Sequence, residues 1–174
     1  MRPPDEDGQP FVFGICWRCS EALTNRQPDP FMSDHEFKKY FTLEEAVSLL
    51  PTVQETLETA QREMDALRDS VILNKRLILA KQSSGRIPSD AEVALLEEKF
   101  CAYEDAVTRW VDHFAEQGII LRDLEAGLID FPYRSKRVRQ DFFLCWRLHE
   151  DGIFYFHGLN EGFSGRHPIT LLPD

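Results

Sequence analysis

Residues 89–118, SDAEVALLEEKFCAYEDAVTRWVDHFAEQG, carry the pattern that decides the fold. Apolar residues recur there at alternating spacings of three and four, at Val93, Leu96, Phe100, Tyr103, Val107, Trp110 and Phe114. A seven-residue repeat of this kind is typical of a helix that packs lengthwise against another helix. Ser89 and Glu92 form a capping box at the start, and Gly118 is expected to end the helix.

The preceding segment, residues 42–82, repeats the same pattern. Thr42 and Glu45 form a second capping box, and Pro51 predicts a kink or a restart of the helix, because proline cannot donate to the helical ladder. The apolar spacing then continues through Val53, Leu57, Ala60, Met64, Leu67, Val71, Asn74 and Ile78, with one polar member.

The two repeats match each other as an antiparallel hairpin, joined by a turn over residues 83–88. The residue numbers of two facing positions add up to a nearly constant value, as in the pairs 78/93, 71/100 and 64/107. Small Ala60 then faces large Trp110, as close packing requires. Asn74 faces Leu96, where a buried amide lowers stability unless it is paired but is able to fix the register.

Residues 119–174 change to a strand-like pattern. Two apolar runs, 142–148 and 153–157, flank Asp151-Gly152, which predicts a hairpin with a two-residue turn. Residues 119–121 and 127–131 add one or two strands, and Pro132 is expected to end the second or to place it at a sheet edge. Residues 162–168 are predicted to form a loop.

The predicted fold class is therefore α+β: a long antiparallel, coiled-coil-like helical hairpin, then a small antiparallel β-sheet and a loop-rich tail. Residues 32–174 are interpreted as a single domain, with the helical hairpin at 42–117 and the β-rich part at 118–174. Residues 1–31 hold half of the ten prolines and are interpreted as a loose extension. One interpretation is that this segment precedes the true translation start.

Composition and charge exclude several functional classes. The chain of 174 residues has 20 basic and 30 acidic side chains, a net charge of −10, so nucleic acid and anionic lipid would repel it. No apolar run approaches the 18 residues or so of a membrane span. The start lacks the basic and apolar regions of a secretory signal, which favours a cytoplasmic location with reduced thiols.

One cysteine pair has the spacing of a metal or redox motif. Two residues separate Cys16 from Cys19, as in a zinc half-site. A zinc site needs four ligands, no second pair lies nearby, and the strand-to-helix context of a redox motif is missing. We therefore interpret this segment as an inert tail, and the sequence assigns no metal or cofactor.

Four segments resemble a bacterial family of uncharacterised proteins, domain of unknown function 2203. They are FTLEEA from Phe41, LRDLEAGLIDFP from Leu121, LCWRLHE from Leu144 and FHGLNEGFSGR from Phe156. The resemblance spans about 41–169 and implies a small cytosolic protein with no assigned activity. His149 and Phe156 depart from the family pattern, which usually has Gly and Trp there.

The family pattern centres on polar and aromatic positions that suggest a site on the sheet. Its matching residues are Asp123, Gly127, Asp130, Phe131, Pro132, Cys145, Trp146, Glu150, His157, Gly162, Phe163 and Arg166. Glu150 and His157 resemble shared metal ligands. In a two-residue hairpin, however, they lie about 13 Å apart, since strands rise ~3.3 Å per residue, and Trp146 pairs with His157.

The candidate binding site therefore combines Asp130, Trp146, Glu150, His157 and Arg166. A carboxylate, an imidazole and a guanidinium beside an aromatic wall would bind a small anion or transfer a proton. The structural alternative is an Arg166–Asp130 ion pair that ties the tail to the sheet. No phosphate loop, GxSxG elbow or HExxH motif is present.

Two functions from different classes are consistent with these patterns. The favoured one is a non-enzymatic binding or assembly module, a homodimer through the helical hairpin, whose apolar residues Leu73, Leu77, Leu95 and Val111 lie off the seam. The alternative is a small enzyme, or a protein that binds a metal or anionic ligand, with a His/carboxylate/Arg site on the sheet.

Overall fold

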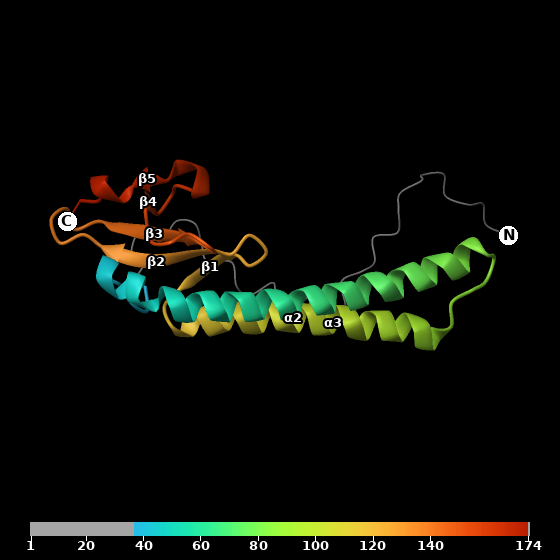
Figure 1. The fold of residues 1–174 in the computed structure, drawn as a ribbon. Coiled ribbons are helices and arrows are strands. Elements are labelled where there is room, and N and C mark those ends of the chain that lie inside the picture. Colours follow the sequence, from blue (N-terminus) through green and yellow to red (C-terminus); the bar gives the residue numbers. More distant parts are fainter. Residues whose placement is uncertain (1–36, 174) are drawn as a thin grey trace. The chain divides into compact units, whose positions relative to one another are not determined.

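The computed structural model describes residues 37–173, which form two long helices followed by a five-stranded sheet (Figure 1). The helices are α2 (Leu43–Ser83) and α3 (Asp90–Glu116). The strands are β1 (Ile120–Asp123), β2 (Leu128–Arg134), β3 (Asp141–Arg147), β4 (Tyr155–Gly158) and β5 (His167–Pro168). Two short 3-10 helices, η1 (Phe163–Gly165) and η2 (Ile169–Leu171), flank β5. The α+β fold predicted from the sequence is confirmed.

Both predicted capping boxes are present. The Thr42 hydroxyl accepts from the Glu45 amide at 3.1 Å and the Glu45 carboxylate accepts from the Thr42 amide at 2.9 Å; Ser89 and Glu92 do the same for α3. Of the kink or restart predicted at Pro51, the restart is wrong, because α2 continues through this residue. Leu50 and Val53 on either side of Pro51 are buried against the sheet, which holds this part of the helix in place.

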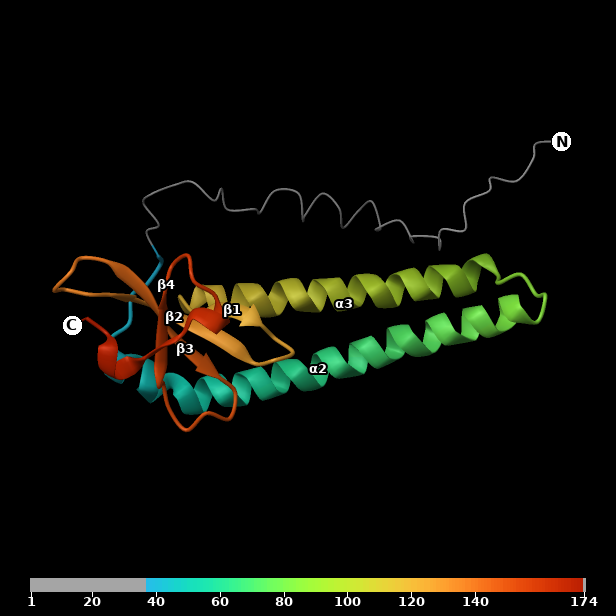
Figure 2. The same cartoon turned by 90° about the horizontal axis from the view of Figure 1, so that it is seen from above.

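The two helices lie side by side along the hairpin (Figure 2). Their seam is buried near the sheet, at Leu57, Ala60 and Met64, and again at Ile78 near the turn. The seam residues between Met64 and Ile78, which are Leu67, Val71 and Asn74, are only half-buried. The hairpin therefore extends well past the part of α2 that carries the sheet.

The sheet is an antiparallel meander with strand order β1-β2-β3-β4-β5. Strand β2 pairs with β3 in a register that sets Asp130 opposite Cys145 and Pro132 opposite Phe143. Strand β3 pairs with β4 so that Phe143 faces His157. Because successive residues of a strand point to opposite faces, this register assigns every side chain to one of two faces.

Pro132 neither ends β2 nor lies in an edge strand, since β2 is the second strand and continues to Arg134. The carbonyl of Pro132 instead accepts from the Phe41 amide at 2.8 Å. The N–H and C=O of one residue point to the same side of an antiparallel strand. The missing N–H therefore points to the side of β2 on which β1 lies, but at a position past the end of β1, because β1 pairs only with residues 128–130.

The inner face of the sheet packs on the first turns of α2 and the end of α3. Ile129, Phe131, Leu144 and Trp146 have no exposed surface on this face, and they pack with the core side chains of the helices. The helical partners in this core are Ala46, Leu50, Val53, Leu57 and Phe114. The opposite, outer face of the sheet is left to the loop-rich tail.

Within residues 37–173 neither helix has an apolar stretch that would let it cross a membrane. The extension predicted at residues 1–31, with Cys16 and Cys19, lies outside the described residues.

Asn74 provides a test of the seam. Its amide donates to the Ser70 carbonyl of its own helix at 2.8 Å rather than across the seam. Asn74→Leu should therefore raise the free energy of unfolding by about 1 kcal/mol, since it adds apolar area and helix propensity. Chemical denaturation checks this, with Lys75→Leu on the exposed side as the control. A lower stability for Asn74→Leu would contradict the seam assignment.

Candidate functional site

Three buried polar side chains meet on the outer face of the sheet, one from each of three adjacent strands. Asp130 comes from β2, Cys145 from β3 and His157 from β4, and they are 1%, 2% and 3% exposed. Asp130 faces Cys145 directly, while His157 faces Phe143, two residues from Cys145 on the same face. One carboxylate oxygen, the thiol sulfur and one imidazole nitrogen all lie within 4.8 Å of one another.

The Asp130 carboxylate is held by two cationic groups. Its Oδ2 atom accepts from Arg122 Nε at 2.6 Å and lies 3.3 Å from His157 Nε2. The Arg122 guanidinium also stacks over the Phe143 ring, 4.7 Å from its centroid. A buried carboxylate is costly unless it is paired, and these contacts supply its partners.

His157 uses both of its ring nitrogens. Nδ1 lies 2.9 Å from the Gly158 carbonyl, which can only accept, so Nδ1 carries a proton. Nε2 then faces the Asp130 carboxylate, and two lone pairs face each other unless a positive charge lies between them. Burial lowers the pKa of His157, but the hydrogen bonds with Asp130 and Gly158 outweigh it and raise the pKa above its ordinary value.

Cys145 is a protonated thiol in this environment. Burial, and then the neighbouring charge of Asp130, raise the pKa of Cys145 to about 12. The thiolate is the nucleophilic form of cysteine, and reactive cysteines have a lowered pKa. The thiol of Cys145 is therefore not arranged as a nucleophile, although metal coordination would deprotonate it.

A small cavity adjoins the three side chains. It measures about 170 Å³ and is lined by Arg122, Leu128, Asp130, Cys145, His157, Leu159, Glu161, Gly162 and Phe163. Four of these residues belong to the segment 158–166, which follows β4. Glu161 orders this segment, since its carboxylate accepts from the Gly158 amide at 2.8 Å and lies 3.4 Å from His167 Nε2.

The predicted two-residue turn at Asp151-Gly152 is wrong, and this moves His157. The β3–β4 connection spans residues 148–154, so His157 pairs with Phe143 rather than with Trp146. Trp146 is buried on the inner face, where its indole nitrogen donates to the Glu150 carbonyl at 3.0 Å. That bond, with the left-handed backbone of His149 at φ 73°, closes the wider connection.

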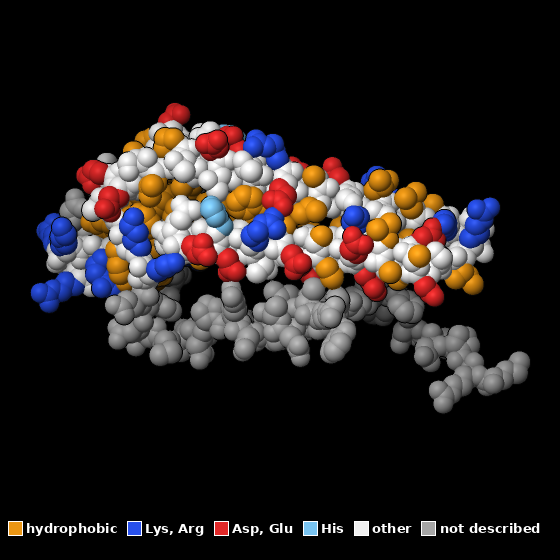
Figure 3. Space-filling model, turned by 90° about the horizontal axis from the view of Figure 1, so that it is seen from below, with side chains coloured by type: hydrophobic (Ala, Val, Ile, Leu, Met, Phe, Trp, Pro, Cys, Tyr) orange, Lys and Arg blue, Asp and Glu red, His pale blue; other side chains and the backbone are white. Residues whose placement is uncertain are grey.

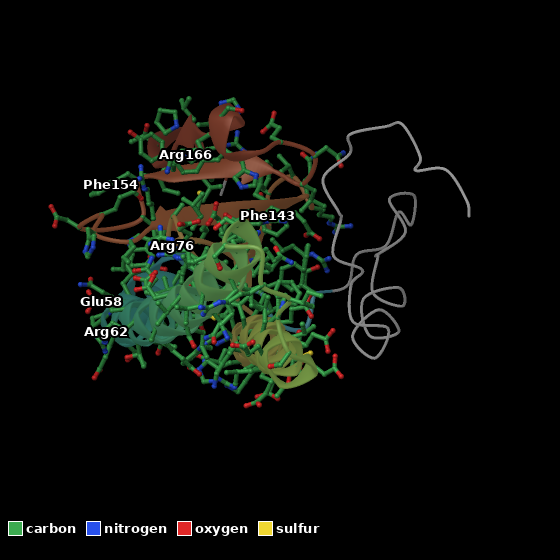
Figure 4. All side chains as sticks on the ribbon, turned by 90° about the vertical axis from the view of Figure 1, so that its right-hand side faces the viewer. Glu58, Arg62, Arg76, Phe143, Phe154 and Arg166 are labelled. Atoms are coloured by element: carbon green, nitrogen blue, oxygen red, sulfur yellow. The ribbon has the colours of Figure 1, made fainter. Side chains whose placement is uncertain are left out.

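Glu150 and Arg166 form a second pair beside the cluster. The Glu150 carboxylate accepts from the Arg147 amide at 3.0 Å and from Arg166 at 3.3 Å. The predicted alternative, an Arg166–Asp130 ion pair, is wrong, because Asp130 pairs with Arg122. In Figure 4 Arg166 lies among the strands, above the two helices viewed end-on.

The aromatic rings of Tyr155 and Phe163 hold the Arg166 guanidinium, whose central carbon lies 4.5 and 3.6 Å from their centroids. Arg166 also lies close enough to Cys145 to influence the pKa of that thiol. It does not line the cavity.

Sequence reasoning brought Asp130 and His157 together but did not include Arg122 or Cys145 in the site. Cys145 belongs to one of the family motifs, and pairing β2 with β3 across a short connection sets it opposite Asp130. Arg122 lies where the β1–β2 register shifts between Leu121 and Asp123. Such bulges redirect a side chain, and no spacing rule in a single sequence indicates them.

A larger hollow of about 530 Å³ lies between α2, α3 and the β1–β2 turn. Several of its polar groups are paired, as in the Arg68–Glu125 ion pair at 3.1 Å and the bond from the Gln61 amide to the Leu124 carbonyl at 3.0 Å. Its lining holds no set of groups comparable to Asp130, Cys145 and His157, so the outer face of the sheet is the better candidate site.

Comparison with known proteins gives one match. The model of the family described as "Uncharacterized conserved protein (DUF2203)" matches residues 39–169. This range includes both helices and the residues around the cavity. No curated protein and no solved structure matches the chain.

Arg166 should act mainly on stability. Its side chain is 16% exposed between two rings, and Glu150 beside it is 22% exposed. Arg166→Gln should lower the free energy of unfolding by about 1–2 kcal/mol, because it removes a cation–π contact and leaves a half-buried carboxylate unpaired. Urea denaturation checks this against Arg137→Gln, the same charge change in the exposed β2–β3 loop. Equal stabilities would show that the pair contributes nothing.

Proposed function

Since the chain belongs to the DUF2203 family, whose description assigns no activity, its function has to be inferred from its own geometry, and we propose that it is a non-enzymatic binding protein. The binding site is the cavity on the outer face of the sheet. The observation that carries this proposal is the convergence of three buried polar side chains, Asp130, Cys145 and His157, on one cavity.

The pairing of these groups supports binding over catalysis. The Asp130 carboxylate is shared by Arg122 and His157, and both nitrogens of His157 have partners. A general base or acid needs an atom that reaches the substrate, and a cysteine nucleophile needs its thiolate. The cluster as it stands offers neither of these.

The size of the cavity indicates a very small ligand. Sites for drug-sized molecules are usually about 300–1,000 Å³, and a water molecule takes about 30 Å³. A cavity of about 170 Å³ has room for an ion with its remaining water ligands, or for a molecule of a few atoms. A cytoplasmic location remains a prediction. So does a lack of nucleic-acid partners, which the net charge of −10 supports.

Filling the cavity should abolish ligand binding. Leu159 lines the cavity, so Leu159→Trp would occupy it, whereas Leu171→Trp adds the same side chain at a position that is 66% exposed. The low-molecular-mass fraction of a cell extract should raise the melting temperature of the wild type and of Leu171→Trp, because ligand binding stabilises the native state. It should leave Leu159→Trp unchanged.

Circular dichroism of each variant checks that the fold is retained. A wild-type melting temperature that does not respond to the extract would contradict the proposal. So would an equal rise in Leu159→Trp, because the ligand would then bind elsewhere.

Self-assembly through the helical hairpin is a second candidate, favoured by apolar side chains that nothing in the described chain covers. Leu73 and Leu77 of α2 are 57% and 55% exposed, and Leu95 of α3 is 41% exposed. Figure 3 shows apolar side chains recurring along the hairpin between charged ones. We propose that the partner is a second copy of this chain.

The seven-residue repeat supports one shared stripe for these leucines. Glu63 of α2 forms an ion pair with Arg109 of α3 beside the seam. Leu77 lies two repeats after Glu63, and Leu95 lies two repeats before Arg109, so they occupy equivalent positions toward the turn. Ser70 and Ala102 come between them, and such small side chains would let the helices of a second hairpin approach closely.

Solution mass tests this second candidate. Light scattering at tens of micromolar should give twice the chain mass of 20.2 kDa for the wild type. Leu77→Glu should give the monomer, because it places a charge in the stripe, while Leu79→Glu, at an exposed position off the stripe, should not. A monomeric wild type with intact helical circular dichroism would contradict the proposal.

A further inference from the structure

We propose that Asp130, Cys145 and His157 bind a single divalent transition-metal ion, and that zinc is the ion their donor set fits best. This inference deepens the proposed binding function and rests on it, because it names the class of ligand that the cavity takes.

The distances between the donor atoms carry the proposal. A carboxylate oxygen, a thiol sulfur and an imidazole nitrogen lie within 4.8 Å of one another. Around a tetrahedral zinc ion with bonds of about 2.0–2.3 Å, such donors are separated by about 3.3–3.8 Å. The three side chains therefore need only a small contraction, and their adjacent strands already hold the backbone in place.

The orientation of His157 agrees with this geometry. Its Nδ1–H donates to the Gly158 carbonyl at 2.9 Å, which directs Nε2 toward Asp130 Oδ2 at 3.3 Å. Histidines that bind metals usually donate their other N–H to a carbonyl or carboxylate in this way. Without a proton on Nε2 two lone pairs would face each other across this gap, so the gap takes a positive charge, and a metal ion would replace the proton there.

The types of donor select the class of ion. Calcium and magnesium bind sites made of oxygen atoms, so a set that contains sulfur and nitrogen does not suit them. Sulfur, nitrogen and oxygen together suit zinc and the neighbouring divalent transition metals. A Cys145 thiolate and the Asp130 carboxylate would place two negatively charged donors on the ion.

The surroundings leave room for the rest of the coordination sphere. Three protein donors leave a fourth position, and the adjoining cavity of about 170 Å³ has room for a water molecule there. Of the nearby guanidinium groups, Arg166 has its own counter-charge in Glu150, whereas Arg122 would share the Asp130 carboxylate with the ion. Asp130 has two carboxylate oxygens, of which Oδ2 accepts from Arg122 and faces His157 Nε2.

Cobalt(II) is the probe for this site, because a bound thiolate gives it a charge-transfer absorption band. The full chain should first carry Cys16→Ser, Cys19→Ser and Cys101→Ser, so that Cys145 is the one remaining thiol. We expect one cobalt ion per chain, the thiolate band, and loss of the band when zinc is added.

Removing any of the three donors should weaken binding. Cys145→Ser should abolish the thiolate band, and Asp130→Asn and His157→Gln should each lower metal affinity more than about a hundredfold, since losing an outer partner alone costs about 10–100-fold. The matched control is His113→Gln, on the exposed side of α3 and outside the cluster.

X-ray absorption of the zinc-loaded parent protein covers the case in which a donor variant does not fold. It should show one sulfur neighbour at about 2.3 Å and nitrogen or oxygen neighbours at about 2.0–2.2 Å. The proposal is overturned if cobalt and zinc do not bind the parent protein, if the band survives Cys145→Ser, or if no sulfur surrounds the zinc.

The cavity-filling experiment separates this failure from failure of the proposed function. If an extract depleted of metals by a chelating resin still stabilises the wild type and Leu171→Trp but not Leu159→Trp, the cavity binds another ligand. In that case the metal site is wrong and the binding function stands.

Discussion

The Asp130 carboxylate carries a charge almost completely out of contact with water, at 1% exposure, and the outer face of the sheet is built to compensate for it. A buried ion without partners costs several kcal/mol or more. Arg122 in β1 and His157 in β4 supply that compensation. The rest of the site follows, because His157 must keep its ring in the plane that reaches Asp130, and the Gly158 carbonyl fixes it there.

The sheet separates two environments by the alternation of its side chains. On β3, Leu144 and Trp146 face the helices, while Phe143 and Cys145 face away from them. The inner face is apolar, and it packs against the apolar side chains of α2 and α3 in one shared core. The outer face concentrates the polar groups, and the segment 158–166 lines the cavity beside them. A change on one face should therefore leave the other largely intact.

The helical half of this fold could be predicted from the sequence, and the sheet only in outline. Capping boxes at Thr42 and Ser89 and a strict seven-residue apolar repeat are local signals, so the predicted boundaries of both helices lie close to the observed ones. Strand register depends on loop length, and there the prediction from Asp151-Gly152 failed. The bond between the Trp146 indole and the Glu150 carbonyl closes a seven-residue connection that no turn dipeptide indicates.

That error in register also explains what was missed at the site. An odd shift in the pairing of β4 against β3 moves its side chains to the other face. The predicted register set His157 beside Trp146, whereas the observed one sets it beside Cys145. Asp130 and His157 were chosen for their chemistry, which does not depend on register. Cys145 and Arg122 become relevant only once the strands are aligned, so sequence spacing alone could not select them.

The meander order of the strands also has a consequence for how the site is assembled during folding. Asp130, Cys145 and His157 lie within one continuous stretch, and two successive hairpins bring them together. Closing such short loops costs little chain entropy and gives a low contact order, which favours rapid formation. By contrast, the bond from the Phe41 amide to the Pro132 carbonyl joins residues far apart in the chain. The cluster is therefore able to form early, before the first turns of α2 close over the inner face of the sheet.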